Sequence, residues 1–284
     1  MPAPVCAVLN MKGGVGKTTL SVNVFRQLYS ENKLSVLLID LDPQFNLTQQ
    51  LMTSDRYETA VAEGKTALRL FEPAPVSDFF SVNVSGNDPP KARDISQRLR
   101  SFGKTEITLS IVPGTFDLTK YSFIEDGAKL SHAKAFFKKF ISEARTSFDL
   151  IVLDMNPSSS FLTFAGLSVA TDVLSPVRPD KFSMLGLGLV RRLIEHPQVA
   201  NKPKLHIVMN GVKRSDGLTD TEVEIRAADY FKTCILANRV YHSGVLAART
   251  DHTGFAIDRK VPHKEQVKKD LRAVEAELRQ RMGM

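Results

Sequence analysis

Hydrophobic residues fall into short runs that recur along most of the chain and contain few polar side chains. Such runs are typical of strands in a parallel sheet that is covered on both faces. They lie at Val5–Leu9, Ser35–Asp40, Leu109–Val112, Leu150–Asp154, Val173–Val177 and Leu205–Met209. Helical patterns separate them, for example from Lys17 to about Ser30, at Ser131–Arg145 and at Leu185–Glu195. This alternation predicts an α/β fold with a mostly parallel, doubly wound sheet, in which ligands bind at the carboxyl ends of the strands.

Two segments depart from this rhythm. Residues 72–106 show little periodicity and contain Pro73, Pro75, Pro89 and Pro90, so we interpret them as a surface excursion on a single domain that spans residues 1–284. The segment Pro262–Met284 predicts a charged helix with an apolar stripe formed by Val267, Leu271, Val274 and Leu278. We expect this stripe to pack on the body of the protein.

Composition excludes several classes of protein. The chain has 284 residues, of which 43% are hydrophobic and 24% charged, as in a globular protein that buries a full core. The distant cysteines Cys6 and Cys234 exclude a disulfide scaffold and fit a reduced, cytoplasmic compartment. Met1–Asn10 lacks the pattern of a signal peptide. The most apolar long window, Phe161–Val177, is too polar for a transmembrane helix, so we expect no transmembrane segment.

Charge is unevenly distributed along the chain. The sequence has 38 basic and 31 acidic residues, a formal net charge of +7. Residues 1–177 carry 18 of each sign, whereas residues 178–284 carry 20 basic and 13 acidic residues. A one-sided basic excess indicates a polyanionic partner, either nucleic acid or an anionic membrane; a solvated basic surface is the alternative.

A glycine-rich loop follows the first predicted strand and opens the first predicted helix, with the sequence Lys12-Gly13-Gly14-Val15-Gly16-Lys17-Thr18-Thr19. In this context the loop is typical of a phosphate-binding site, because glycines let backbone N–H groups crowd around phosphates and the helix N-terminus adds partial positive charge. We expect the whole stretch to bind the phosphates of a nucleotide. Lys17 would reach the β- and γ-phosphates, and the Thr18 hydroxyl would ligate Mg²⁺.

The loop departs from the strict G-x-x-x-x-G-K-[ST] pattern, because Met11 stands at the first glycine position and a second lysine, Lys12, precedes the glycine pair. In this it resembles the deviant Walker A loop of the ParA/MinD family of ATPases, over nearly the whole chain except residues 72–106. The resemblance implies a P-loop NTPase and a slow, Mg²⁺-dependent ATPase. It also implies that Lys12 crosses the interface of an ATP-dependent homodimer and contacts the nucleotide bound by the second copy.

The same resemblance implies roles for residues at other strand ends. Asp40-Leu41-Asp42-Pro43-Gln44 matches the family's D-x-D-P-Q motif, so that Asp42 would orient the attacking water and Asp40 would lie at the Mg²⁺. Asp154 ends a strand that resembles Walker B, which implies a further metal ligand. The family continues D-x-P-P-S, whereas Asn156 replaces the first proline here. Asn210 stands where relatives place an adenine-reading asparagine; a turn residue is the alternative. Lys12, Lys17 and Asp42 are the predicted catalytic residues.

The resemblance also connects the basic excess with DNA. ParA-type members bind DNA without sequence preference through basic residues in their C-terminal part, and the candidates here are Arg191, Arg192, Lys213 and Arg214. Solvated surface is the alternative for each of them. The implied protein is a cytoplasmic, nucleoid-associated partition ATPase. It would position a plasmid, chromosome or other cargo, with hydrolysis stimulated by a ParB-like or other centromere-binding adaptor.

Two other functions remain open from the sequence. A MinD-type membrane-associated ATPase needs an amphipathic tether at its C-terminus, for which the heavily charged Pro262–Met284 segment is a poor candidate. A metabolic ATP-dependent enzyme on the same fold is the second alternative. The two isolated cysteines exclude the usual bridging iron–sulfur cluster, and a ligase has no need of Lys12 in trans.

Overall fold

The computed structural model describes residues 2–74, 78–86, 88–103, 105–156, 158, 160–247 and 253–284. In these residues eight strands form one sheet in the order β3-β4-β2-β5-β1-β6-β7-β8. Every neighbouring pair of strands is parallel except β3 with β4. The strands are β1 (Val5–Val8), β2 (Val36–Asp40), β3 (Gln97–Ser101), β4 (Thr108–Val112), β5 (Leu150–Asp154), β6 (Asp172–Val177), β7 (Lys204–Val212) and β8 (Val240–Tyr241).

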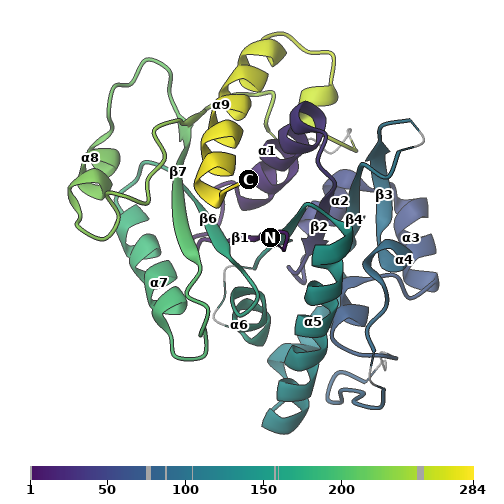
Figure 1. The fold of residues 1–284 in the computed structure, drawn as a ribbon. Helices are drawn as coiled ribbons and strands as arrows, with labels where there is room; N and C mark the ends of the chain where they lie inside the picture. Colours follow the sequence, from purple (N-terminus) through teal and green to yellow (C-terminus); the bar gives the residue numbers. More distant parts are fainter. Residues whose placement is uncertain are drawn as a thin grey trace.

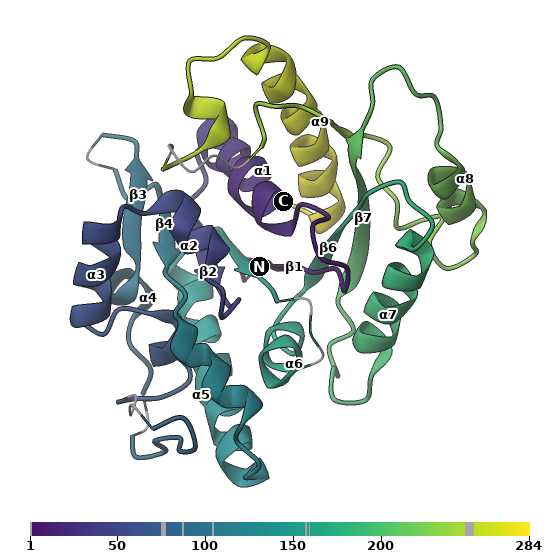
Figure 2. The same ribbon diagram turned by 180° about the vertical axis from the view of Figure 1, so that it is seen from behind.

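Helices cover both faces of the sheet, as Figures 1 and 2 show from opposite sides. One apolar cluster joins α1 and α9 to one face, and a second joins α5, α6 and α7 to the other. Because both faces are covered, both rows of side chains on the central strands are buried. The helices are α1 (Lys17–Asn32), α2 (Asn46–Leu51), α3 (Ser54–Ala62), α4 (Ala92–Ile95), α5 (Gly127–Ser147), α6 (Phe161–Leu167), α7 (Ser183–Glu195), α8 (Asp220–Ala227) and α9 (Lys264–Met282).

The expected α/β fold with a mostly parallel, doubly wound sheet is confirmed. Each hydrophobic run forms a strand, and β7 extends further than its run, to Val212. The stripe on α9 packs against α1 and the sheet as expected, with Leu271, Val274 and Leu278 fully buried. In the described part of the chain, no helix combines the length and apolarity that crossing a bilayer requires.

Residues 72–106 pack more closely against the rest of the protein than the surface excursion that the sequence predicts. Gln97–Ser101 adds β3 to the edge of the sheet, antiparallel to β4. Sequence periodicity missed this strand because only Leu99 of its five side chains is buried. At the start of the segment, Glu72 is fully buried and pairs with Lys120 at 2.8 Å. Pro75 lies outside the described residues.

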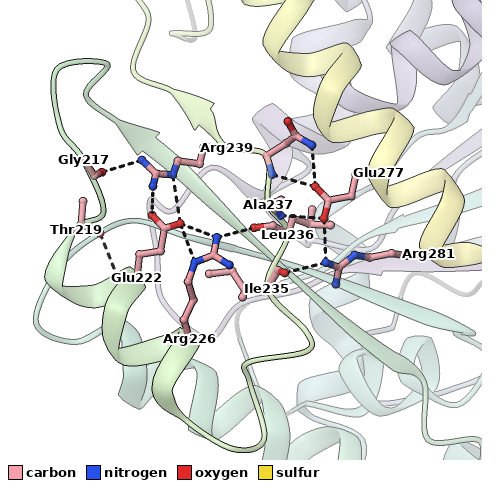
Figure 3. A network of polar contacts seen from close by, with 11 residues as sticks. Gly217, Thr219, Glu222, Arg226, Ile235, Leu236, Ala237, Arg239, Glu277 and Arg281 are labelled. Atoms are coloured by element: carbon pink, nitrogen blue, oxygen red, sulfur yellow. Dashed lines mark hydrogen bonds and ion pairs between the residues drawn. The ribbon is translucent and has the colours of Figure 1, made fainter.

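Ion pairs on a buried carboxylate and a partly buried carboxylate fasten α8 and α9 to the segment that precedes β8 (Figure 3). Glu222 of α8 is fully buried, and its carboxylate pairs with Arg226 at 2.8 Å and with Arg239 at 3.0 Å. Glu277 of α9 accepts hydrogen bonds from the backbone that precedes β8 and pairs with Arg281 at 2.9 Å. These arginines therefore contribute to the packing of the fold, and neighbouring carboxylates offset their charges.

Candidate active site

The loop between β1 and α1 has the geometry of a phosphate-binding loop. Gly14 and Gly16 have φ angles of 71° and 96°, in the left-handed region that favours glycine. A Cβ on Gly16 would meet the side chain of Asn210, whereas Cβ atoms on Gly13 and Gly14 would meet nothing within 4 Å. The loop is thus packed on its protein side and open on the other. The N-cap of α1 is Gly16, which has no side chain to accept from the first N–H groups of the helix, so these groups are suited to bind an anion.

Residues of α1 and β5 form the candidate Mg²⁺ site. The hydroxyls of Thr18 and Ser21 donate to the two carboxylate oxygens of Asp154, at 2.9 and 2.7 Å. Ser21 was missed by the sequence analysis, although its position one turn after Thr18 places both on one helix face. Among the described residues, no group of three or more His, Cys, Asp and Glu side chains could hold a metal alone. Mg²⁺ is commonly held by one or two protein groups together with substrate phosphates, and Thr18 and Asp154 are protein groups of that kind.

Two carboxylates meet at the ends of neighbouring strands. Asp40 of β2 and Asp154 of β5 are partners in the parallel register, and both are buried. Burial, and then the charge of Asp154, raises the pKa of Asp40 to about 8. Burial also raises the pKa of Asp154, to about 6, although the hydrogen bonds from Ser21 and Thr18 oppose the rise. A cation near Asp154 would relieve the repulsion within the pair.

Asp40 contacts protein donors on both of its carboxylate oxygens. Oδ1 accepts a hydrogen bond from the backbone N–H of Asp42 at 3.2 Å. Oδ2 accepts from the backbone N–H and the hydroxyl of Thr48, at 2.9 and 2.7 Å. These contacts favour a role for Asp40 in positioning the Asp42 loop over the direct metal coordination expected from the sequence. Asp154 is then the better candidate for the Mg²⁺.

Because Asp40 and Asp154 are buried together, the free energy of unfolding should depend on pH in a way that can be measured. An unfolded aspartate titrates near 3.8, so between about pH 4 and 8 the folded chain holds a proton on Asp40 that the unfolded chain has released. Rising pH in this window therefore lowers the free energy of unfolding. Since Asp40→Asn cannot ionise, we expect its free energy of unfolding to rise by about 3–4 kcal/mol relative to that of the wild type between pH 5 and pH 8. Urea unfolding of the metal-free proteins measures the difference.

The control for this experiment is Asp55→Asn, at an exposed position on α3. Its free energy of unfolding should run parallel to that of the wild type over the same pH range. Parallel curves for Asp40→Asn as well would show that Asp40 is ionised in the folded protein at pH 5 and would contradict the prediction.

Asp42 lies in the loop after β2, with 8% of its surface exposed. Its Oδ1 accepts hydrogen bonds from the backbone N–H of Gln44 at 2.9 Å and from Nδ2 of Asn156 at 2.8 Å. In the described part of the chain, no donor reaches Oδ2 within hydrogen-bonding distance. The structure thus holds one oxygen of Asp42 and leaves the other for a further ligand. Pro157, the next residue of the Walker B loop, lies outside the described residues.

The two lysines of the loop have different surroundings. Burial lowers the pKa of Lys17, while the charges of Asp154 and Asp42 oppose this shift, and its Nζ lies 3.4 Å from the backbone oxygen of Lys12. Lys12 instead points toward the loop after β6, where its Nζ pairs with Asp180 at 2.5 Å. The sequence analysis missed Asp180, because no local pattern connects it with a residue so distant along the chain. Lys12 is therefore held within its own subunit in this structure.

Asn210, the expected adenine reader, contacts the phosphate-binding loop. It lies in β7 and is 6% exposed, and its Nδ2 donates to the backbone oxygen of Val15 at 2.7 Å. The same side chain fills the space that a Cβ on Gly16 would need. This contact gives Asn210 a role in supporting the loop. Adenine recognition by Asn210 stays a prediction.

The four candidate DNA-binding residues divide into two pairs on different elements. Arg191 of α7 pairs with Glu195 at 2.9 Å and lies over the ring of Tyr230, whereas Arg192 is exposed. Arg214 pairs with Asp270 of α9, whereas Lys213 is exposed. Arg192 and Lys213 are therefore the members of the set that can best contact a phosphate without breaking an ion pair.

The doubly wound sheet, the open glycine loop and the buried carboxylates at the strand ends together define a P-loop nucleotide-binding protein. The family model of the AAA domain matches residues 3–207. The chain belongs to this family, and within it to the ParA/MinD type of Walker ATPase.

Relatives agree with this assignment. Chromosome-partitioning ATPase Soj of Treponema pallidum is 26% identical over 192 residues, which cover 67% of this chain and 63% of Soj. The chain thus spans less than two thirds of that relative. The structure of Cyanthece apo McdA has a TM-score of 0.70 at 17% identity and covers 97% of this chain and 99% of McdA. The structure of cobyrinic acid a,c-diamide synthase from Mycobacterium smegmatis, with bound ADP and magnesium, has a TM-score of 0.66 at 22% identity. The match covers 99% of this chain and 97% of the synthase. These likenesses show the fold.

Proposed function

We propose that this chain is a ParA-type partition ATPase, which forms a homodimer with ATP, binds DNA without sequence preference and releases it after hydrolysis. The observation that carries the proposal is the phosphate-binding loop with its two lysines, together with Asp42, whose Oδ2 accepts no hydrogen bond among the described residues. Similarity to a chromosome-partitioning ATPase supports it. A ParB-like or other centromere-binding adaptor would stimulate the cycle, at the nucleoid in the cytoplasm.

The residues of the site fit ATP and Mg²⁺. Backbone N–H groups from Gly13 to Thr19 and the Lys17 ammonium bind the phosphates. Thr18 and Asp154 are the groups that hold Mg²⁺, which neutralises phosphate charge when bound. Asp42 accepts a hydrogen bond from the attacking water through Oδ2 and orients it toward the γ-phosphate. In the dimer, Lys12 adds a positive charge to the phosphates of the second subunit.

The surroundings of α9 argue against the membrane alternative. A membrane-surface helix has to present its apolar side to lipid. The apolar side of α9 is instead buried against α1 and the sheet. Lys213 and Arg192, by contrast, are exposed on elements of the basic last third of the chain. These features favour DNA over a lipid surface as the polyanionic partner.

We expect DNA affinity that depends on ATP and on salt. Because contacts with phosphates release counterions, about four contacts per dimer would weaken binding about 100-fold between 50 and 200 mM salt. Gel-shift titrations of random-sequence DNA with ATP, with ADP and without nucleotide measure this. Arg192→Ala and Lys213→Ala should each weaken binding about equally on any sequence. Lys138→Ala on α5 removes the same charge elsewhere and serves as the matched control.

Liposome sedimentation under the same conditions separates the two polyanionic partners. Binding to anionic liposomes but not to DNA would favour a MinD-type membrane function. Equal DNA affinity with ATP and ADP would contradict the proposed control of DNA binding by the nucleotide, even if DNA is bound.

A further inference from the structure

Asn156 stands two residues after Asp154, in the loop that follows β5. Asp42 stands two residues after Asp40, in the loop that follows β2. Because β2 and β5 are neighbours with Asp40 opposite Asp154, the register brings these two loops together. Nδ2 of Asn156 lies 2.8 Å from Oδ1 of Asp42. The contact therefore follows from the topology of the sheet and joins two loops that lie far apart in sequence.

The chemistry of the two groups determines the direction of this hydrogen bond. An ionised carboxylate only accepts, so the amide nitrogen of Asn156 has to face it, and the amide oxygen points away. The bond is charge-assisted, and it lies at a position where Asp42 is 8% exposed. No other hydrogen bond of the Asn156 side chain occurs in the described residues. Within the described part of the chain, Asp42 is therefore the one hydrogen-bond partner of this side chain.

Asp42 is held on one oxygen from two directions. The backbone N–H of Gln44 fixes Oδ1 from within the same loop, and Asn156 fixes it from the loop after β5. Two donors on one oxygen hold the carboxylate rotation so that Oδ2 keeps one orientation. A proline at position 156 has no donor, and an aspartate would place a second negative charge against the first. Asparagine supplies the donor without the charge.

We propose that Asn156 is a positioning residue for Asp42, which it orients for its role with the attacking water. The inference rests on the proposed ATPase function. It also makes the orientation of Asp42 depend on the conformation of the loop after the Mg²⁺-binding strand, because the donor belongs to that loop. A change at the metal site would therefore reach Asp42 through Asn156.

The test is a double-mutant cycle with ATP turnover and nucleotide affinity measured separately. We expect Asn156→Ala to lower kcat about 10-fold and Asn156→Asp to lower it about 100-fold, with the Kd for ATP changed less than threefold. In an Asp42→Ala background, Asn156→Ala should lower the residual rate no further, since its target is gone. Ser160→Ala, in the same loop, is the matched control and should retain the wild-type rate.

The outcomes separate this inference from the proposed function. Absence of ATP hydrolysis by the wild type would overturn the proposed function itself. Normal kcat in both Asn156 variants of an active protein would overturn the positioning role alone. An equal loss from Asn156→Ala with and without Asp42 would also overturn it, because the effect would then be a general disturbance of the loop.

Discussion

Asp42→Ala is expected to lower the rate of ATP hydrolysis by about 100- to 1,000-fold while ATP binding persists. The carboxylate contacts its own loop and Asn156 through one oxygen, and in the described residues its second oxygen accepts no hydrogen bond. Removing it takes away the group that aligns water for attack, whereas Lys17 and the glycine backbone still bind the phosphates. Release of inorganic phosphate and the Kd for a fluorescent ATP analogue measure the two effects.

Asp42→Asn is the matched variant, because it keeps the shape and the acceptor for the Gln44 backbone but removes the charge. We expect a loss nearly as large as that in Asp42→Ala, since a neutral amide is a weaker acceptor for the water. Hydrolysis at the native rate in either variant would exclude Asp42 from the assigned role. A parallel loss of ATP binding would assign it to the binding site instead.

The arrangement of strands and helices was largely predictable from the sequence, because both faces of the central sheet are buried. Burial on both faces requires continuous apolar runs, and β2 and β5 display them over their full length. The antiparallel edge strand β3 escaped prediction, because Arg98 and Arg100 stand in a strand that buries only Leu99. An edge strand is held by backbone hydrogen bonds, which leave little mark on the side-chain pattern.

The candidate site was predictable where one motif carries several residues. Gly16, Lys17 and Thr18 follow one another in one loop, so their joint role is visible locally. The pairing of Asp42 with Asn156 and of Lys12 with Asp180 depends on how loops meet at the sheet edge. Neither contact has a signal in the sequence alone, because the partners are separated by more than one hundred residues.

The basic excess of residues 178–284 predicts a polyanionic partner, but it does not show which basic groups would contact that partner. A net charge counted from the sequence does not show which basic groups can face a partner, because that depends on the ion pairs that form in the folded chain. Arg226 and Arg239 share the buried carboxylate of Glu222, and Arg214 is paired with Asp270. A candidate DNA-binding surface therefore has to be built from residues such as Lys213, which are exposed and belong to no such pair in the described part of the chain.

The position of Lys12 implies a competition between two partners. In the single subunit its ammonium pairs with Asp180 at 2.5 Å, and the Phe182 ring centroid lies 5.8 Å away. Both partners of the pair are about one third exposed, so the ion pair can open at small cost. The proposed dimer would offer Lys12 a phosphate, and a charge contact enclosed between two subunits would be stronger than one exposed to water. ATP in a second subunit would thus draw Lys12 away from Asp180.

Lys12→Ala is therefore expected to weaken ATP-dependent dimerisation about 100-fold, because truncating one member of an interfacial charge contact leaves the other unpaired. Sedimentation velocity with ATP measures this in the Asp42→Ala background, where slow hydrolysis preserves the bound nucleotide. Asp180→Ala, which removes the competing partner in the monomer, should dimerise at least as tightly as its parent. ATP-dependent dimers of Lys12→Ala at the parent's affinity, together with normal hydrolysis when Asp42 is intact, would exclude Lys12 from the second subunit's site.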